Sequence, residues 1–372
     1  MNIIPVSEPL IGKREEELVL DCLRSGWISS EGKYVKEFEK KCASYCSMNA
    51  GISVSAGTAA LQVAVSCLPI DKGDEIIMPA FTIISCATAI IESGAKPVLV
   101  DCDADTWTMN TEEIEQKITN KTKAIMAVHI YGHSVDMQPV NELAKKHNLF
   151  VIEDAAEAHG AEYKGTKCGG LSDISILSFY ANKLVTTGEG GMVLTNNKEF
   201  EERARSLRNL CFKKEKRFFH TEIGHNYRMS NIQAAIGLAQ LEKLDLFVDR
   251  KREMAKSYNN QLSKLPLQLP IEKEWAKNIY WMYGIVLNKQ AGIVRSDFMK
   301  ELEKKGIESR PFFVGMHEQP VLRDMGLFSG ENYPVCEYIS KQGLYLPSGH
   351  AITNSQIQYI TDSINEIFST FS

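Results

Sequence analysis

The stretch Ser172–Gly191, SDISILSFYANKLVTTGEGG, decides how the rest of the chain is interpreted. Its first half is an apolar run with the length and composition of a buried strand, and residues 192–195 form a second such run. Lys183 therefore lies in a connection between two apolar segments, shortly before a glycine cluster. A lysine in a turn is usually exposed to solvent. A desolvated lysine instead loses its charge readily and forms Schiff bases, so this stretch alone leaves both interpretations open.

A second stretch supplies a partner for this lysine. Residues 149–152 form an apolar strand, and the acidic sequence EDAAE, residues 153–157, follows at once. Ligands of open α/β sheets bind beyond the carboxyl ends of the strands, where Asp154 and Lys183 would both lie. Pyridoxal 5′-phosphate (PLP) requires a lysine that carries its aldehyde and a carboxylate that keeps its pyridine nitrogen protonated. The two stretches together favour a PLP site.

The order of the segments predicts the fold class. Strand-like and helix-like segments alternate from about residue 50 to residue 195. This alternation is typical of an α/β fold with a mostly parallel sheet flanked by helices. No GxGxxG follows a strand and no GxxxxGK[ST] occurs, which argues against dinucleotide-binding and P-loop proteins. The small-residue turn at residues 56–61 opens a helix, and such a helix start is a natural though unspecific anion site.

The motifs IEDAAEAHG (152–160) and SFYANKLVTTGEGG (178–191) closely resemble those of the nucleotide-sugar aminotransferases of the DegT/DnrJ/EryC1/StrS family. The resemblance extends along nearly the whole chain, through SAGTAAL, PAFTIISCATAI, VHIYG, NYRM and GIESRP. It implies a PLP-dependent transferase of fold type I, built like aspartate aminotransferase. We expect a large PLP-binding α/β domain over residues 1–250, including an N-terminal arm at Met1–Leu10, and a small α+β domain over residues 251–372.

The resemblance also assigns roles to single residues. It makes Lys183 the catalytic residue that binds PLP covalently, and Asp154 the partner of the pyridine nitrogen. Ile83 stands where family members usually place an aromatic residue on the pyridine ring, so we expect packing without the π contact, a loss of about 1 kcal/mol. The family motifs further imply cofactor contacts from Gly57, Thr58, Glu157, Ser178 and Asn226, of which Asn226 reaches the phosphate in the partner subunit's site.

Two further segments resemble parts of the family that border the substrate. Trp27 and Ser29 belong to the loop WISSEG, where the tryptophan either packs under its own loop or faces the substrate. Arg310 and His317 follow the sequence GIES and resemble an element near the sugar. An ordinary strand with a surface histidine explains the second segment equally well.

Composition excludes several classes of protein. The chain has 372 residues, of which 44% are hydrophobic and 24% charged, so it is long enough for a sizeable core. Its net charge of −5 gives no sign of a nucleic-acid-binding surface. Nine cysteines without a CxxC pair favour reduced thiols in the cytoplasm. We recognise no signal peptide and no apolar run of membrane-spanning length. His129 and His133 span a strand end and a glycine rather than one helix face, so we expect no metal site.

The resemblance implies transamination of a nucleotide-linked keto-deoxy sugar with L-glutamate as the amino donor, in a homodimer with active sites at the interface. Its motifs are most similar to the branch that converts GDP-4-keto-6-deoxymannose to GDP-perosamine for surface polysaccharide such as O-antigen or capsule. A UDP- or dTDP-linked sugar is the nearest alternative. A PLP-dependent sugar dehydratase is disfavoured, because that branch has histidine in place of Lys183. A regulator that binds PLP without turnover stays open.

Overall fold

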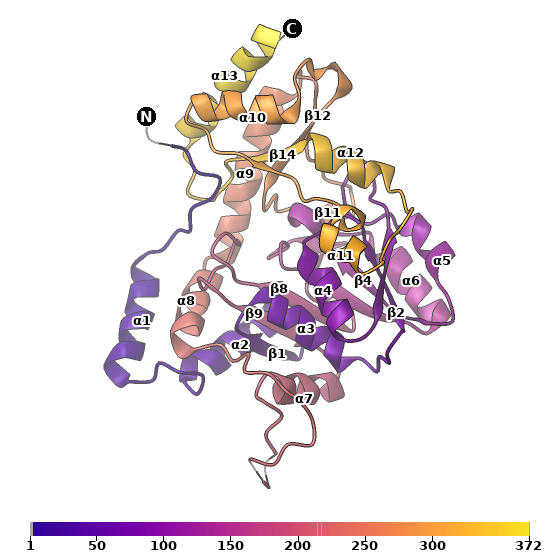
Figure 1. Ribbon diagram of the computed structural model, residues 1–372. Coiled ribbons are helices and arrows are strands. Elements are labelled where there is room, and N and C mark those ends of the chain that lie inside the picture. Colours follow the sequence, from indigo (N-terminus) through magenta and orange to yellow (C-terminus); the bar gives the residue numbers. More distant parts are fainter. Residues whose placement is uncertain (1–2, 214, 217, 372) are drawn as a thin grey trace.

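The computed structural model describes residues 3–213, 215–216 and 218–371 (Figure 1), so Met1 and Asn2 of the predicted arm, and the terminal Ser372, lie outside the described residues. A seven-stranded sheet with the order β1-β9-β8-β5-β4-β2-β3 forms its centre. The five strands from β8 to β3 run parallel, while β9 is antiparallel to both its neighbours, which confirms the predicted mostly parallel sheet. These strands are β1 (Ala50–Val54), β2 (Glu75–Pro79), β3 (Lys96–Val100), β4 (Thr122–Val128), β5 (Phe150–Asp154), β8 (Ile174–Ser178) and β9 (Gly191–Thr195).

Helices flank this sheet, as the sequence predicted for an α/β fold (Figure 1). One of them, α1, stands away from the sheet and packs on α8. The helices of this part are α1 (Lys13–Ser25), α2 (Lys33–Tyr45), α3 (Gly57–Cys67), α4 (Ile84–Glu92), α5 (Ile114–Lys117), α6 (Met137–His147), α7 (Lys198–Leu207) and α8 (Asn231–Leu241). Short 3₁₀ helices occur at η1 (Thr111–Glu113), η2 (Ile130–Gly132), η3 (Lys289–Ala291) and η4 (Met316–Glu318).

Strand β5 shows how the sheet divides the core into two clusters. Its side chains alternate between faces, as the pleat of a strand requires. Val151 joins the apolar cluster that contains the buried residues of α6, while Ile152 joins the cluster that contains those of α3 and α4. The next pair of side chains continues this alternation, so Glu153 lies on the α6 side and Asp154 on the α3 and α4 side. The pleat of the strand alone therefore places these two adjacent acids on opposite faces of the sheet.

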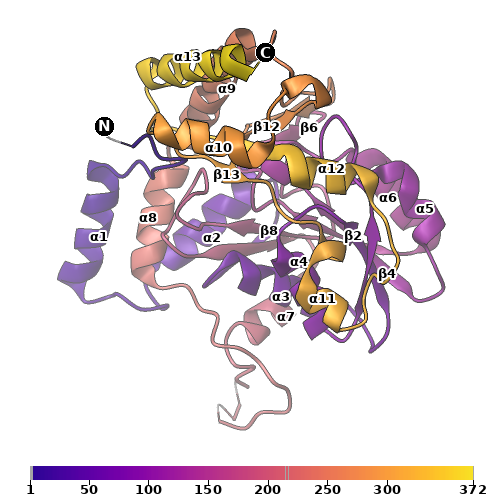
Figure 2. The same cartoon turned by 45° about the horizontal axis from the view of Figure 1, so that its top comes forward.

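A second, four-stranded sheet with the order β10-β12-β14-β13 belongs to the C-terminal part of the chain. In Figure 2 the helices α10, α12 and α13 of this part lie together at one end of the molecule. Helix α9 carries the chain unbroken past residue 250, where we predicted the domain boundary, and that boundary stays a prediction. The elements are α9 (Leu244–Leu262), β10 (Leu267–Gln268), β12 (Tyr283–Leu287), α10 (Arg295–Lys304), β13 (Arg310–Pro311), α11 (Pro320–Asp324), α12 (Pro334–Gln342), β14 (Gly343–Leu346) and α13 (Asn354–Phe371).

Two smaller features connect the parts. A three-stranded sheet joins β11 (Ala276–Lys277) to β6 (Glu162–Tyr163) and β7 (Thr166–Lys167). The N-terminal arm runs along the C-terminal part, because the Ile4 N–H donates to the carbonyl of Gly306 at 2.8 Å. Within the described ranges, no helix combines the length and apolarity that a membrane crossing needs.

Candidate active site

Lys183 lies in the connection between β8 and β9, as the sequence predicted. The strands pair up to Ser178 and Gly191, and the connection then closes on itself, since the Phe179 N–H donates to the Gly190 carbonyl at 2.8 Å. Gly190 leaves no room for a side chain, because a Cβ there would come within 2.3 Å of the Thr187 hydroxyl. The glycine cluster therefore shapes a compact loop, and this loop holds the backbone of Lys183.

Asp154 ends the neighbouring strand β5 and points toward the same space. Its side chain is buried, with 2% of its surface exposed. One carboxylate oxygen accepts the Ala156 N–H at 3.0 Å, and the other accepts the Cys86 thiol at 3.2 Å. Burial raises the pKa of Asp154, because the surroundings disfavour its charged form. A buried acid with few donors is suited to bind a cationic group, such as a protonated pyridine nitrogen.

Glu157, in the turn after β5, lies between the Lys183 side chain and the backbone of Tyr131. Its Oε1 lies 3.4 Å from the Nζ of Lys183, and its Oε2 accepts the Tyr131 N–H at 2.9 Å. Tyr131 adopts φ = 52°, a left-handed conformation that is uncommon for an aromatic residue and here directs its N–H at the acid. Burial raises the pKa of Glu157, although Lys183 opposes this shift.

These side chains line one pocket of about 300 Å³. Its other walls include the aromatic residues Trp281, Phe313 and Tyr345 from the C-terminal part of the chain. The pocket thus lies between the large sheet and the C-terminal part of the chain. It brings together every predicted cofactor residue except Asn226, namely Gly57, Thr58, Ile83, Asp154, Glu157, Ser178 and Lys183.

One end of the pocket has the features of a phosphate site. Helix α3 begins at Gly57, so its free N–H groups and the positive end of its dipole face the pocket. Gly57 packs so tightly on β8 that a Cβ there would come within 2.7 Å of the Cβ of Ser178. The Thr58 hydroxyl lies 2.9 Å from that of Ser85. With a lysine, a buried carboxylate and this helix start, the donor set fits PLP.

Ile83 occupies the rim of the pocket. It is the residue that precedes α4, and 41% of its surface is exposed. From this position its side chain would pack on a flat ring bound in the pocket, and this role stays a prediction. Position 83 thus contributes an aliphatic side chain to the pocket, and not an aromatic one.

Asn226 lies outside this pocket. It is exposed, and its Oδ1 accepts the Nε–H of Arg228 at 2.9 Å. The next residue, Tyr227, accepts the Ser55 N–H through its carbonyl at 2.8 Å, which places this segment beside the end of β1. The loop between α7 and α8, to which Asn226 belongs, projects from the body of the molecule (Figure 1). Its predicted role in a partner's site stays a prediction.

The loop with Trp27 and Ser29 also lies outside the pocket lining. Asn231, the first residue of α8, holds this loop: its Nδ2 donates to the Trp27 carbonyl at 2.6 Å, and its backbone N–H donates to the Ser29 carbonyl at 2.9 Å. The Trp27 side chain is 58% exposed, so it does not pack under its own loop. Its contact with substrate stays a prediction.

Arg310 and His317 occupy different surroundings. Arg310 is exposed on β13 and forms an ion pair with Glu308 at 3.0 Å. His317 is 2% exposed, packs against Tyr333, and lies 3.4 Å from the carboxylate of Glu337. Neither side chain lines the pocket, and their contacts with the sugar stay predictions.

Several residues of the site were missed in the sequence, among them Cys86 and Trp281. Cys86 lies on α4 and contacts both the Thr82 hydroxyl and Asp154, but a lone buried cysteine gave no functional signal. Trp281 lies far along the chain, in the segment between β11 and β12, and no motif marked it. Both reach the site through tertiary packing.

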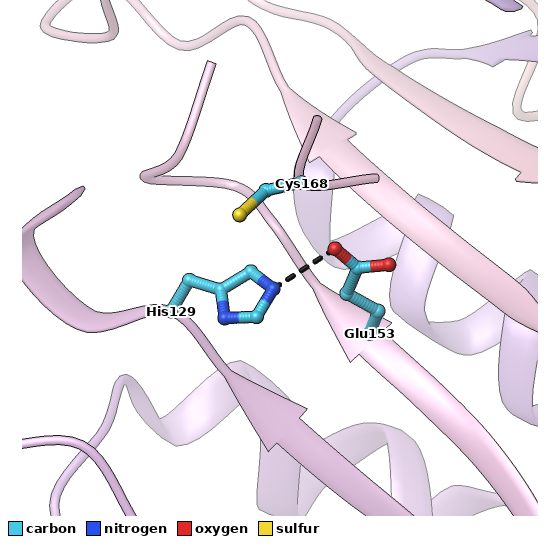
Figure 3. A group of neighbouring side chains, drawn as sticks. All are labelled: His129, Glu153 and Cys168. Atoms are coloured by element: carbon cyan, nitrogen blue, oxygen red, sulfur yellow. Dashed lines mark hydrogen bonds and ion pairs between the residues drawn. The ribbon is translucent and has the colours of Figure 1, made fainter. Parts of the chain in front are cut away.

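A second group of side chains, His129, Glu153 and Cys168, has the composition of a metal site (Figure 3). The Val135 N–H donates to Nδ1 of His129 at 3.0 Å, which leaves the ring proton on Nε2, 2.9 Å from Glu153. Both oxygens of Glu153 also accept backbone N–H groups, from residues 169 and 171. The ligand atoms of His129 and Glu153 are thus used inside the protein, which favours a buried polar network that ties β4 to β5.

Comparison with known proteins gives this pocket its context. Residues 9–365 match the DegT/DnrJ/EryC1/StrS aminotransferase family. The chain is 44% identical over 369 residues to a GDP-perosamine synthase of Escherichia coli, covering 99% of this chain and 100% of the relative. It is 38% identical over 367 residues to a GDP-perosamine synthase of Vibrio cholerae, with the same coverage.

Solved structures agree with these sequence relatives. Helicobacter pylori PseC, an aminotransferase of pseudoaminic acid biosynthesis, superimposes with a TM-score of 0.93 at 28% identity, over 99% of this chain and 100% of that one. The PLP form of Streptococcus pneumoniae Spr1654 also has a TM-score of 0.93, at 26% identity over 100% of both chains. The predicted fold is therefore confirmed. The chain belongs to the DegT/DnrJ/EryC1/StrS aminotransferase family and is a sugar aminotransferase.

Proposed function

We propose that this enzyme uses PLP to transfer the amino group of L-glutamate to GDP-4-keto-6-deoxymannose, giving GDP-perosamine for a surface polysaccharide such as O-antigen or capsule. The observation that carries the proposal is the buried constellation of Lys183, Glu157 and Asp154 in one pocket beside the start of α3. The similarity to two GDP-perosamine synthases over nearly the full chain supports the choice of sugar.

The residues of the pocket divide the chemistry among them. PLP, when bound, supplies an electron sink for the carbanion that forms on the substrate carbon. Asp154 holds the pyridine nitrogen, and the start of α3 with Ser178 holds the phosphate. Lys183 would hold the cofactor through its Nζ. Once released, its Nζ accepts the proton from Cα of glutamate and later delivers a proton to the sugar carbon that receives the nitrogen.

Burial of this site supports the proton transfers. Lys183 exposes 10% of its side chain and Glu157 exposes 8%, so little water competes with them. Glu157 contacts the lysine Nζ with one oxygen, while its other oxygen is fixed by the Tyr131 N–H. Such a fixed geometry removes much of the entropic cost of bringing a base to its substrate.

A homodimer completes the proposal. The segment around Asn226 carries exposed apolar side chains, including Ile223 at 86% and Phe219 at 53%, and Trp27 is exposed as well. Exposed apolar groups that gather on one segment are typical of surfaces that another protein covers. We propose that a second copy covers them and that Asn226 thereby reaches the partner's phosphate site. The cytoplasmic location expected from the cysteine pattern also stays a prediction.

The proposal is tested by incubating the purified protein with PLP, L-glutamate and GDP-4-keto-6-deoxymannose. Release of 2-oxoglutarate and a sugar nucleotide with the mass of the amino sugar are the expected results, and the Lys183→Ala variant is the matched control. Turnover only with a UDP- or dTDP-linked keto sugar would replace the GDP sugar and keep the aminotransferase. Cofactor binding without turnover of any keto sugar would instead favour the PLP-binding regulator.

A further inference from the structure

The side chain of Trp281 lies directly against the reactive nitrogen of the site. The Nζ of Lys183 lies 3.6 Å from the centroid of the Trp281 ring system. Trp281 is 6% exposed, so this contact is shielded from water. A cation over the face of an indole is attracted by the negative charge density of the ring, and the attraction is stronger where water is excluded. Trp281 and Glu157 are thus two separate partners for the Lys183 ammonium group.

Trp281 is fixed at both its side chain and its backbone. Its indole Nε1–H donates to the carbonyl of Asn182 at 2.9 Å, which is the residue before Lys183. Its own carbonyl accepts the Nζ of Lys251 at 2.8 Å. Lys251 is 2% exposed, and it also donates to the carbonyl of Ser348. The indole therefore cannot turn away from Lys183 without losing its hydrogen bond to Asn182, while Lys251 holds the backbone of Trp281 in place.

The backbone around Trp281 is equally confined. Gly132, at the end of η2, lies so close that a Cβ on it would come within 2.7 Å of the Trp281 backbone nitrogen. Gly132 also has φ = 100°, a conformation that residues with side chains rarely adopt. The C-terminal part of the chain thus packs closely on the part that contains the large sheet at this contact, and this packing places the indole against the Nζ of Lys183.

We propose that Trp281 is a further catalytic residue, whose indole face holds the amino group of Lys183 whenever this group is not bound to the cofactor. The inference rests on the proposed function in one respect: transamination releases Lys183 in each half of the cycle. A released ammonium group on a flexible chain of four carbons needs a fixed partner to remain near the reacting carbon. Lys251 acts through Trp281 and is a positioning residue.

The first test uses the protein without cofactor, so it does not depend on any sugar substrate. An acylating reagent attacks only the neutral amine, and peptide mass spectrometry measures the rate at Lys183. Loss of the π face in Trp281→Leu should speed acylation about tenfold, since the ammonium form loses its partner. Trp281→Phe keeps a ring face and should stay within about threefold of the wild type. The matched control is Trp275→Leu, which removes a tryptophan that packs on Tyr163 outside the pocket and should leave the rate unchanged.

The second test uses the PLP-loaded enzyme and compares kcat with KM for L-glutamate. A misplaced proton carrier slows the chemical steps, so Trp281→Leu should lower kcat about tenfold with little change in KM, and Trp281→Phe should restore most of it. Equal behaviour of the leucine and phenylalanine variants in both tests would overturn the proposal, and so would wild-type acylation in Trp281→Leu. Absence of amino-sugar product in all variants would contradict the proposed function, while the acylation rates would still decide the role of Trp281.

Discussion

The Nζ of Lys183 and the Oε1 of Glu157 lie 3.4 Å apart, and both side chains are almost fully buried. The pair joins two segments that follow different strands of the sheet, β8 and β5. Burial raises the pKa of Glu157, and the nearby lysine opposes this shift, so the charge of Glu157 depends on Lys183. This dependence makes the pair the natural starting point for tests of the site.

Replacement of Lys183 by alanine should abolish both covalent cofactor binding and transamination. The variant lacks the amine that binds the aldehyde and moves the proton, and loss of such a group costs about 10²–10⁴-fold in rate or more. The absorbance of bound PLP and the release of 2-oxoglutarate measure the two effects. Lys198→Ala, which removes an exposed lysine at the start of α7, is the control and should keep both properties. Turnover in Lys183→Ala would refute the assigned role.

The buried acids should cost stability in the protein without cofactor. Burial raises the pKa of both Asp154 and Glu157. The folded state therefore binds protons more tightly than the unfolded state, so stability falls as the pH rises from the unfolded pKa through the folded one. Asp154→Asn should thus stabilise the cofactor-free protein near neutral pH and flatten this fall, while it weakens PLP binding.

Thermal unfolding between pH 4 and pH 8, read as Tm, measures this effect over about the range in which carboxyl groups with raised pKa titrate. Glu157→Gln is the companion variant and should behave in the same direction. An Asp154→Asn protein whose Tm fell below that of the wild type at neutral pH would show that the Ala156 and Cys86 contacts outweigh the burial cost.

An aromatic residue at position 83 should strengthen PLP binding. Ile83 lies at the rim of the pocket with 41% of its surface exposed, so a larger ring has room there. Stacking on the pyridine ring is worth about 1 kcal/mol, which is roughly a fivefold lower Kd for PLP in Ile83→Tyr. Equilibrium titration of the cofactor-free protein measures the change. Leu246→Tyr adds the same ring on the exposed side of α9 and should leave the Kd as it is.

Asn226 can be tested by mixing two inactive proteins. If Asn226 serves the partner's site, Asn226→Ala has defective phosphate binding and Lys183→Ala lacks the base, but a mixed dimer contains one site with both residues intact. Equal mixing after subunit exchange should restore about a quarter of the wild-type activity, since half of the dimers are mixed and half of their sites are intact. Activity that stays at the level of the separate variants would place Asn226 in the site of its own chain.

The sequence by itself determined the class of the fold and the centre of the chemistry. The alternation of strand-like and helix-like segments predicted the parallel sheet. Its strands could be recognised because a strand buried on both faces must be apolar throughout. Asp154 and Lys183 could be found since Asp154 ends one strand and Lys183 lies in the connection after another, and strand ends of such sheets meet at one edge. The alternating pleat even separates Glu153 from Asp154, which now belong to a buried network and to the pocket respectively.

Only the tertiary structure decided which distant residues complete the pocket. Cys86 reaches Asp154 from α4, and Trp281 reaches Lys183 from a segment that begins almost a hundred residues later. Neither contact has a sequence signal, because an apolar or aromatic side chain serves packing and ligand binding equally well. The buried bond from Lys251 to the Trp281 carbonyl is decided in the same way: it depends on how α9 packs against the C-terminal sheet, and local sequence carries no information on that packing.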